Sequence, residues 1–201
     1  NLYAANDEER FCEAVIKGIK AWEGEYEVFG GQSLTVQLEV TTKSKFLDSI
    51  HIYLLNAEGR EMLEGVARGA GKLGQETIEE MTETFAEKDT SFATIGKKWT
   101  VKSMKTIYIK SEDAEASDYE EISDIVTHEF GHALGLGDLY KNPQIGLKGV
   151  PKGTFEELDS YYVSPNWYNL VMCNHHGMIS NNDIEMIVLA FSENARQNYQ
   201  P

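Results

Sequence analysis

Two histidines, His128 and His132, stand four residues apart in the run His-Glu-Phe-Gly-His, and this spacing constrains the fold more than any other feature of the chain. Residues four apart lie one turn above each other on the same face of an α-helix. Their ring nitrogens therefore converge on a single ion only if this stretch is helical. Glu129 lies beside them, too close in sequence to be a third ligand. The run predicts a helix that carries a metal site.

The flanking sequence predicts a buried helix that ends soon after His132. A capping-box pattern stands at 117–120, and Gly135 comes three residues after His132. A helix commonly ends on such a glycine, which adopts positive φ without strain and would turn Asp138 back toward the metal. Apolar residues recur through the motif at helical spacing: Ile122, Ile125, Val126, Ala133 and Leu134.

The carboxylate of Glu129 suits a catalytic metal better than a structural one. A catalytic zinc ion keeps one coordination position open for water, and a neighbouring carboxylate can take the proton of that water. Glu129 is therefore the candidate general base. The third ligand stays open at this stage, because Asp138 could merely cap the turn. In that case the ligand could be one of four downstream residues: Glu156, Glu157, His175 or His176.

Length and charge narrow the class of protein. The 201 residues fit one domain, 1–201, with an N-terminal subdomain over 1–137 and a C-terminal subdomain over 138–201. With 33 acidic against 18 basic residues, the net charge of −15 argues against nucleic acid and anionic membranes as partners. No apolar run approaches the roughly 20 residues of a bilayer span. The chain begins at Asn1 without Met, so we expect a processed or trimmed form from which any secretion signal would have been lost.

Periodicity and turn residues predict an α+β fold in which a twisted, mixed sheet packs on helices. Helices are expected over 7–22 and after Ser180, where a cap-like start precedes an apolar face. Residues 59–88 are helix-forming but interrupted by glycines. Strands are expected over four stretches, 34–40, 49–55, 98–103 and 105–110, and residues 139–165 read mostly as loop.

Two further features leave alternatives open. Cys12 and Cys173 are expected to be buried thiols, with a bridge between them as the alternative, and no Cys-x-x-Cys pair indicates a second zinc site. The acidic stretch 112–118 is expected to be a solvated linker. A calcium site there is the alternative, but its carboxylates lack a fixed spacing, so calcium is unsupported.

The run His128-Glu129-x-x-His132-x-x-Gly135-x-x-Asp138 resembles the metzincin clan of zinc endopeptidases, whose pattern ends in His or Asp and is followed by a Met-turn. The Asp-ending form looks like the snapalysin group, and the run through Leu139-Tyr140 is also similar to the immune inhibitor A group. The stretch 172–184 looks like the Met-turn and closing helix of matrix metalloproteases. These resemblances cover about 128–191.

The resemblance implies a zincin-like fold, one catalytic Zn²⁺ ion and hydrolysis of protein or peptide substrates. It makes His128, His132 and Asp138 the zinc ligands, Glu129 the base and Met172 the Met-turn residue, with Met178 as the fallback. It also implies that His175 or His176 could donate to the oxyanion, as a tyrosine does in some metzincins. An aromatic cluster before this turn could shape an apolar specificity pocket, and aromatic packing of a long loop is the alternative; its members are Tyr161, Tyr162, Trp167 and Tyr168. Secretion is expected, and a latent enzyme whose zinc is blocked by a pro-segment or inhibitor is a further alternative.

Overall fold

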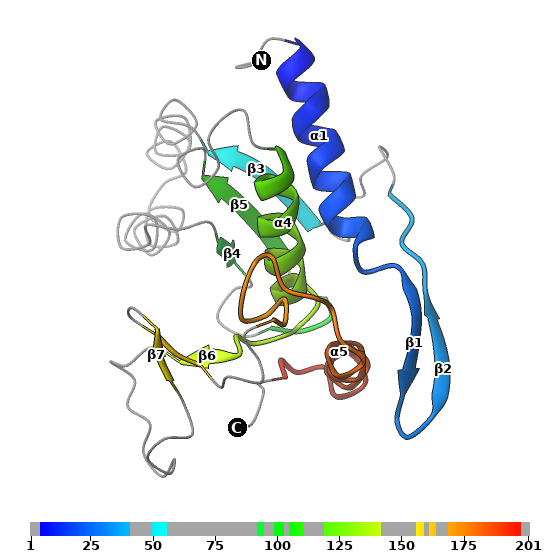
Figure 1. Cartoon of the computed structure of the whole chain (residues 1–201). Coiled ribbons are helices and arrows are strands. Elements are labelled where there is room, and N and C mark those ends of the chain that lie inside the picture. The colour runs from blue at the N-terminus through cyan, green and yellow to red at the C-terminus, as the bar shows by residue number, and fades with distance from the viewer. Residues whose placement is uncertain are drawn as a thin grey trace, which may run out of the picture.

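The computed structural model describes residues 5–40, 50–55, 92–94, 99–102, 105–110, 119–141, 156–158, 161–163 and 169–197. Within these ranges the protein is an α+β fold (Figure 1). Its helices are α1 (Ala5–Lys20), α4 (Tyr119–Ala133) and α5 (Asn181–Glu193). Its strands are β1 (Gly24–Val28), β2 (Gln32–Val36), β3 (Ile50–Leu55), β4 (Phe92–Thr94), β5 (Lys105–Lys110), β6 (Tyr140–Lys141), β7 (Glu156–Leu158) and β8 (Tyr161–Val163).

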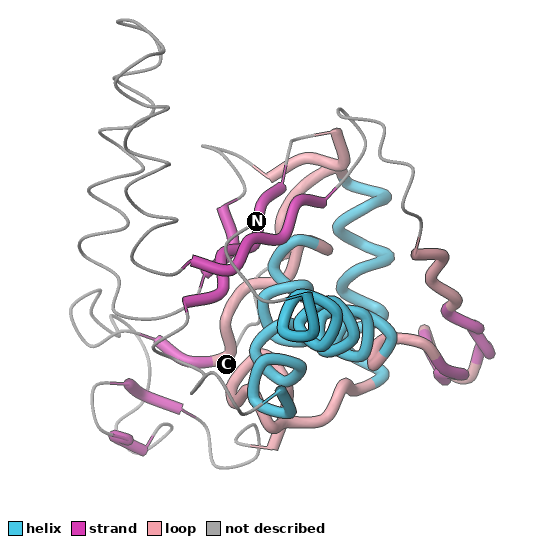
Figure 2. The backbone as a smooth tube through the Cα atoms, turned by 90° about the horizontal axis from the view of Figure 1, so that it is seen from above, coloured by secondary structure: helices cyan, strands magenta, loops and turns pink. Residues whose placement is uncertain are grey.

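A mixed sheet in the order β3-β5-β4 supports the helix α4. The central strand β5 pairs parallel with β3 and antiparallel with β4, and Ile107 and Ile109 on β5 are completely buried. α4 packs against β5 on one side and against α1 on the other. Seen from above, the helices gather on one face of the sheet (Figure 2). The expected mixed sheet with helices packed against it is therefore present.

Close packing of α1 against α4 fixes the position of the helix that carries the histidines. A Cβ atom at Gly18 would lie 2.4 Å from the carbonyl oxygen of Ser123, so only glycine allows this approach. Thr127 Oγ1 donates to the Gly18 carbonyl at 3.1 Å, and Trp22 Nε1 donates to the Thr127 carbonyl at 3.0 Å. These two buried hydrogen bonds set α4 against α1 immediately before His128.

The end of α4 is held by contacts from distant parts of the chain. The indole Nε1 of Trp99 donates to the carbonyl of Ala133 at 3.1 Å. It thereby pairs one of the last-turn carbonyls that have no hydrogen-bond partner within the helix. Gly135 follows with φ +102, as the sequence predicts. Gln197, after α5, bonds the Gly135 carbonyl and the Gly137 amide, both at 2.9 Å. The turn is thereby fixed on both sides.

The C-terminal helix begins where the sequence predicts. Ser180 is the N-cap of α5 and forms a reciprocal capping box with Asp183, whose side chain is completely buried. A separate hairpin, β1-β2, packs on the same helix through β1. Its tip residue Phe29 donates its backbone amide to the carboxylate of Glu185.

Several expectations about secondary structure need correction. Residues 99–102 are not part of a strand: Val101 and Lys102 form a turn, because Lys105 Nζ donates to the carbonyls of Thr100 and Val101, both at 3.1 Å. The stretch 139–165 contains the antiparallel sheet β6-β8-β7 rather than loop alone. Helix α1 ends at Lys20, two residues before the expected end, and β2 spans 32–36 rather than 34–40. The helical region expected over 59–88 lies outside the described residues.

Comparing Gly135→Ala with Gly30→Ala distinguishes the cost of backbone strain from the cost of overpacking at the end of α4. A Cβ atom at Gly135 would lie 2.8 Å from both Ala190 Cβ and Trp99 Cζ2, whereas one at Gly30, also at positive φ, would meet nothing within 4 Å. Positive φ and overpacking each cost about 1–3 kcal/mol. We expect Gly135→Ala to lower the free energy of unfolding in urea by about 2 kcal/mol or more beyond Gly30→Ala. Equal losses would mean that Trp99 and Ala190 move aside without cost.

Candidate metal centre

His128, His132 and Asp138 converge where α4 ends. His132 Nε2 lies 3.1 Å from Asp138 Oδ1, and His128 Nε2 lies 3.5 Å from the same oxygen. The two imidazole rings lie 4.8 Å apart between centroids and are almost perpendicular, at 89°. The helical spacing provides the ring pair, and the turn at Gly135 brings the carboxylate back to it.

The spacing of these three atoms suits a tetrahedral metal ion. Zinc bonds of about 2.0–2.1 Å to nitrogen and oxygen, at a tetrahedral angle, place two ligand atoms about 3.3 Å apart. The observed distances of 3.1 and 3.5 Å lie on either side of that value. Both distances to Asp138 Oδ1 are thus of the size expected between two ligand atoms of one tetrahedral ion.

Hydrogen bonds to the second ring nitrogens determine which nitrogens face the ion. His128 Nδ1 lies 2.7 Å from the Val171 carbonyl, and His132 Nδ1 lies 3.0 Å from the Leu136 carbonyl. A carbonyl only accepts, so each Nδ1 must carry the hydrogen, and in the neutral ring each Nε2 then offers a lone pair. This is the support that metal-binding histidines usually receive from the surrounding protein.

Asp138 contributes a third acceptor to the same point. Its side chain is 32% exposed, but its Oδ1 atom is buried and has no hydrogen-bond donor among the described residues. Burial alone would raise the pKa of Asp138, but the neighbouring His132 and His128 outweigh it and hold that pKa well below its usual range. A single cation satisfies all three acceptors.

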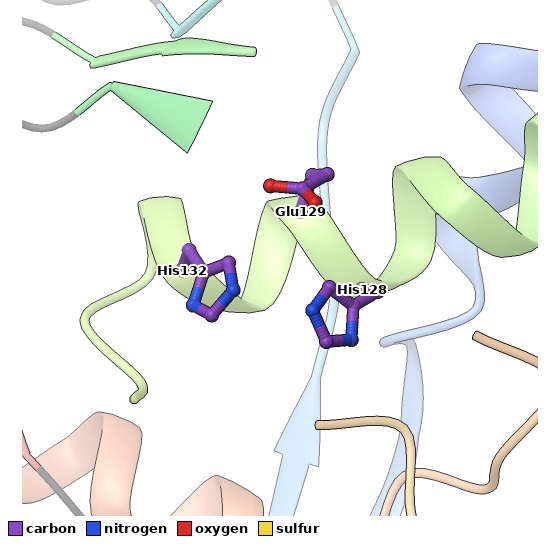
Figure 3. A group of neighbouring side chains, drawn as sticks. All are labelled: His128, Glu129 and His132. Atoms are coloured by element: carbon purple, nitrogen blue, oxygen red, sulfur yellow. The ribbon is translucent and has the colours of Figure 1, made fainter. Parts of the chain in front are cut away.

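Glu129 is buried beside the histidines and offers a second carboxylate. It is 5% exposed, and ligand-type atoms of His128, Glu129 and His132 lie within 4.8 Å of one another. This group could therefore hold a metal by itself. Its carboxylate, however, leaves the helix on a different side from the two rings (Figure 3), whereas Asp138 Oδ1 faces both Nε2 atoms. Asp138 Oδ1 is therefore the candidate third ligand atom, and Glu129 lies beside the two rings.

Met172 lies under the histidine helix in a tight turn, and we call residues 169–178 the Met172 turn. The Met172 side chain is completely buried, and a Cβ atom at Gly131 would lie only 2.4 Å from its sulfur. The preceding residue, Val171, provides the carbonyl that orients His128. Met178, the fallback for this position, is 69% exposed and does not support the site.

The structure separates the two histidines of the Met172 turn. The His175 ring lies 5.0 Å from the His128 ring between centroids, tilted by 59°. His176 instead points its Nδ1 at Asp124, 2.6 Å from Oδ2, on α4 one turn before His128. Only His175 therefore has its ring against a candidate ligand.

Other predicted site residues are not described at side-chain level. Tyr168 and the acidic stretch 112–118 lie outside the described residues. Glu156 and Glu157 lie in β7, where only the backbone is described. Tyr161 and Tyr162 lie in β8 under the same limit.

The chain was compared with family models, characterised proteins and solved structures. None of them matches it. The candidate site therefore rests on the residues and their geometry. None of the described helices is long and apolar enough to cross a membrane.

Four supporting groups were not anticipated from the sequence. They are the Val171 and Leu136 carbonyls that orient the rings, the Trp99 indole that caps α4, and the Asp124 carboxylate that binds His176. Backbone carbonyls carry no sequence signal. Asp124 does carry one, because it stands four residues before His128 and thus on the same helical face.

The two cysteines differ from expectation and from each other. Both thiols are free in the structure, and Cys12 is exposed on α1 rather than buried. Cys173 is half-buried, and burial, assisted by the Asp138 carboxylate, raises the pKa of its thiol to about 11. Since the thiolate is the nucleophile, only about one Cys173 in a thousand is reactive at pH 8.

We expect iodoacetamide to label Cys12 at least about tenfold faster than Cys173, as measured by peptide mass spectrometry. Equal labelling rates would contradict the half-buried position and raised thiol pKa of Cys173.

Proposed function

We propose that this protein is a zinc-dependent endopeptidase. The observation that carries the proposal is the convergence of His128 Nε2, His132 Nε2 and Asp138 Oδ1, with the buried carboxylate of Glu129 beside them. Three protein ligands leave a position for water or substrate, which distinguishes a catalytic zinc site from a structural site with four ligands. The resemblance of the run 128–138 to the metzincin pattern supports peptide hydrolysis as the reaction and a metzincin-type fold as its setting.

The chemistry of the ligands favours zinc over calcium. Two imidazole nitrogens and one carboxylate oxygen are typical zinc ligands, whereas calcium takes six to eight oxygen ligands. At zinc sites, a histidine commonly binds the ion through one ring nitrogen and donates the N–H of its other ring nitrogen to a backbone carbonyl. The two hydrogen bonds from Nδ1 of His128 and of His132 provide it.

Each residue then has a distinct role in hydrolysis. When bound, the zinc ion polarises the scissile carbonyl and makes an adjacent water more acidic. Glu129 accepts a proton from that water as the water oxygen adds to the carbonyl carbon. The carbon–nitrogen bond then breaks, and Glu129 delivers the proton to the leaving amine. One water is consumed, and one carboxylic acid and one amine are formed, which become a carboxylate and an ammonium ion when the acid proton passes to the amine.

A second candidate is a protein that keeps the zinc fold for binding and performs no chemistry. A binding role requires the ligands but no base. The buried carboxylate of Glu129 next to the ring pair therefore favours catalysis, because burying a carboxylate costs free energy that a binding protein has no reason to retain.

A peptide library tests the proposal. We expect the zinc-loaded protein to cleave internal peptide bonds, the activity to disappear with 1,10-phenanthroline, and stoichiometric zinc to restore it. Products are identified by mass spectrometry, and a His128→Ala/His132→Ala double variant serves as the inactive control. Cleavage that survives both the chelator and the double variant would contradict the proposal. Zinc binding without any cleavage would favour the binding protein.

A further inference from the structure

The chain that joins His132 to Asp138 is held on its inner edge by α4. The Leu136 amide donates to the Gly131 carbonyl at 3.0 Å, and the Leu136 carbonyl accepts the Nδ1 hydrogen of His132 at 3.0 Å. Leu136 itself is completely buried. The direction of this one carbonyl therefore sets the orientation of a candidate ligand ring, and Asp138 follows two residues later.

The outer edge of the same chain is held by Gln197, which follows α5. Gln197 forms a parallel bridge with Leu136: the Gln197 amide donates to the Gly135 carbonyl, and the Gln197 carbonyl accepts from the Gly137 amide, both at 2.9 Å. The Gly137 N–H and the Leu136 carbonyl belong to one planar peptide unit. The bond from Gly137 to Gln197 therefore fixes the plane in which that carbonyl faces His132.

Gln197 is in turn anchored on the last turn of α5. The Ala195 amide donates to the Ala190 carbonyl at 3.1 Å, and Gln197 Nε2 donates to the carboxylate of Glu193 at 2.9 Å. We call residues 195–197 the clamp. The clamp thus connects α5 to the peptide units that lie between two candidate metal ligands.

We propose that the clamp positions His132 and Asp138 for metal binding, with Gln197 as a positioning residue that acts through its backbone. This inference rests on the metal site of the proposed function and is independent of peptide hydrolysis. Groups that orient a metal ligand typically change the metal affinity by about 10-fold to 100-fold. Without the clamp, the peptide unit behind His132 is free to turn and the chain leading to Asp138 is held on one edge only. Linkage makes the effect reciprocal, so zinc should stabilise the closed clamp by the same factor.

The competing role of the clamp is to stabilise the fold without acting on the metal site. The two roles differ in the zinc affinity of the folded protein. A variant that is less stable but still folded in nearly all molecules keeps its zinc Kd, because the fraction of binding-competent protein stays close to one. A variant whose ligands are misplaced loses zinc affinity while it remains folded.

Two substitutions at Gln197 isolate the backbone bond. Gln197→Pro removes the N–H that bonds the Gly135 carbonyl, whereas Gln197→Ala keeps both backbone bonds, and both variants lose the side-chain bond to Glu193. We expect Gln197→Pro to raise the zinc Kd at least about tenfold, and Gln197→Ala to change it less than about twofold. Competition with a fluorescent zinc chelator measures the Kd, and circular dichroism of the metal-free proteins shows whether each variant is folded.

Bound Co²⁺ adds a spectroscopic readout, since its visible absorption depends on the number and geometry of its ligands. The spectrum of the Co²⁺-loaded protein should change in Gln197→Pro and match the wild type in Gln197→Ala. A loss of stability alone would leave the spectrum of the folded protein unchanged.

Hydrogen exchange of the wild type tests the reciprocal effect without any substitution, and so decides the question even if Gln197→Pro does not fold. We expect zinc to slow exchange of the Gln197 and Gly137 amides at least about tenfold, and to change exchange of the β1 amides less than about twofold. The rates are measured residue by residue by NMR spectroscopy.

Three results would overturn the role of the clamp: an unchanged zinc Kd in folded Gln197→Pro, an equal loss of affinity in Gln197→Ala, or exchange of the Gln197 amide that zinc does not affect. Zinc binding that depends on the clamp, without any peptide cleavage by the wild type, would contradict the endopeptidase proposal and support the clamp. Chelator-sensitive cleavage with zinc affinity independent of the clamp would do the reverse.

Discussion

Glu129→Gln is expected to lower kcat for peptide cleavage by about 100-fold to 10,000-fold, the usual contribution of a positioned general base. The amide has nearly the same shape as the carboxylate but cannot accept the proton of the attacking water. Because Glu129 is assigned no ligand role, the variant should still bind one zinc ion with an affinity close to that of the wild type. The measurement is steady-state cleavage of a library-selected peptide, together with zinc titration.

Glu120→Gln is the matched control, since Glu120 lies on the same helix, is exposed and forms a surface ion pair with Lys17. A surface ion pair of this kind contributes little, so activity and stability should hardly change. Two results would contradict the role of Glu129. One is full chelator-sensitive cleavage by Glu129→Gln, and the other is a loss of zinc as large as that caused by removing a histidine.

Asp138→Ala is expected to weaken zinc binding by at least about 100-fold. Even groups that only support a metal ligand change the affinity by about 10-fold to 100-fold, and Asp138 provides the ligand oxygen itself. Activity at saturating zinc should fall as well, because His128 and His132 alone leave the ion poorly positioned. Competition with a fluorescent zinc chelator measures the affinity, and thermal unfolding of the metal-free protein shows whether the variant remains folded.

Glu156→Ala and Glu157→Ala are the informative comparisons for Asp138. Both positions were alternative sources of the third ligand, and both lie in β7. The Asp138 assignment requires that neither change alters zinc affinity by more than about twofold. A large loss at either glutamate, with Asp138→Ala unaffected, would transfer the third ligand to β7.

The part of the site that sequence predicts well depends on local geometry. The four-residue spacing of His128 and His132 has one structural meaning on a helix, and Gly135 at the predicted end of that helix does adopt positive φ. Asp138 comes only three residues after Gly135, so the turn at Gly135 suffices to bring its carboxylate close to both rings. Ser180 is a similar case, because its capping box with Asp183 involves only neighbouring residues.

What sequence reasoning missed depends on contacts between distant residues. Apolar and polar residues alternate over 99–102 and suggest a strand. In the structure, Lys105 Nζ donates to the carbonyls of Thr100 and Val101, and the Trp99 indole donates to the end of α4. Among the short strands within 139–165, β8 has residues that favour strands, but β7 begins with two glutamates and β6 has only two residues, so their pairing depends on contacts with β8. His175 and His176 are equivalent in sequence, and only the position of Asp124 on α4 distinguishes them. The metzincin resemblance and the roles it implies stay predictions.

A crystal structure of the zinc-loaded protein, with the ion located by its anomalous scattering, tests the central claim most directly. The predicted result is one ion bound by His128 Nε2, His132 Nε2 and the Asp138 carboxylate, with a water in the remaining position and Glu129 within hydrogen-bond distance of that water. An ion bound directly by Glu129, or one with a residue of β7 or the Met172 turn in place of Asp138, would contradict it.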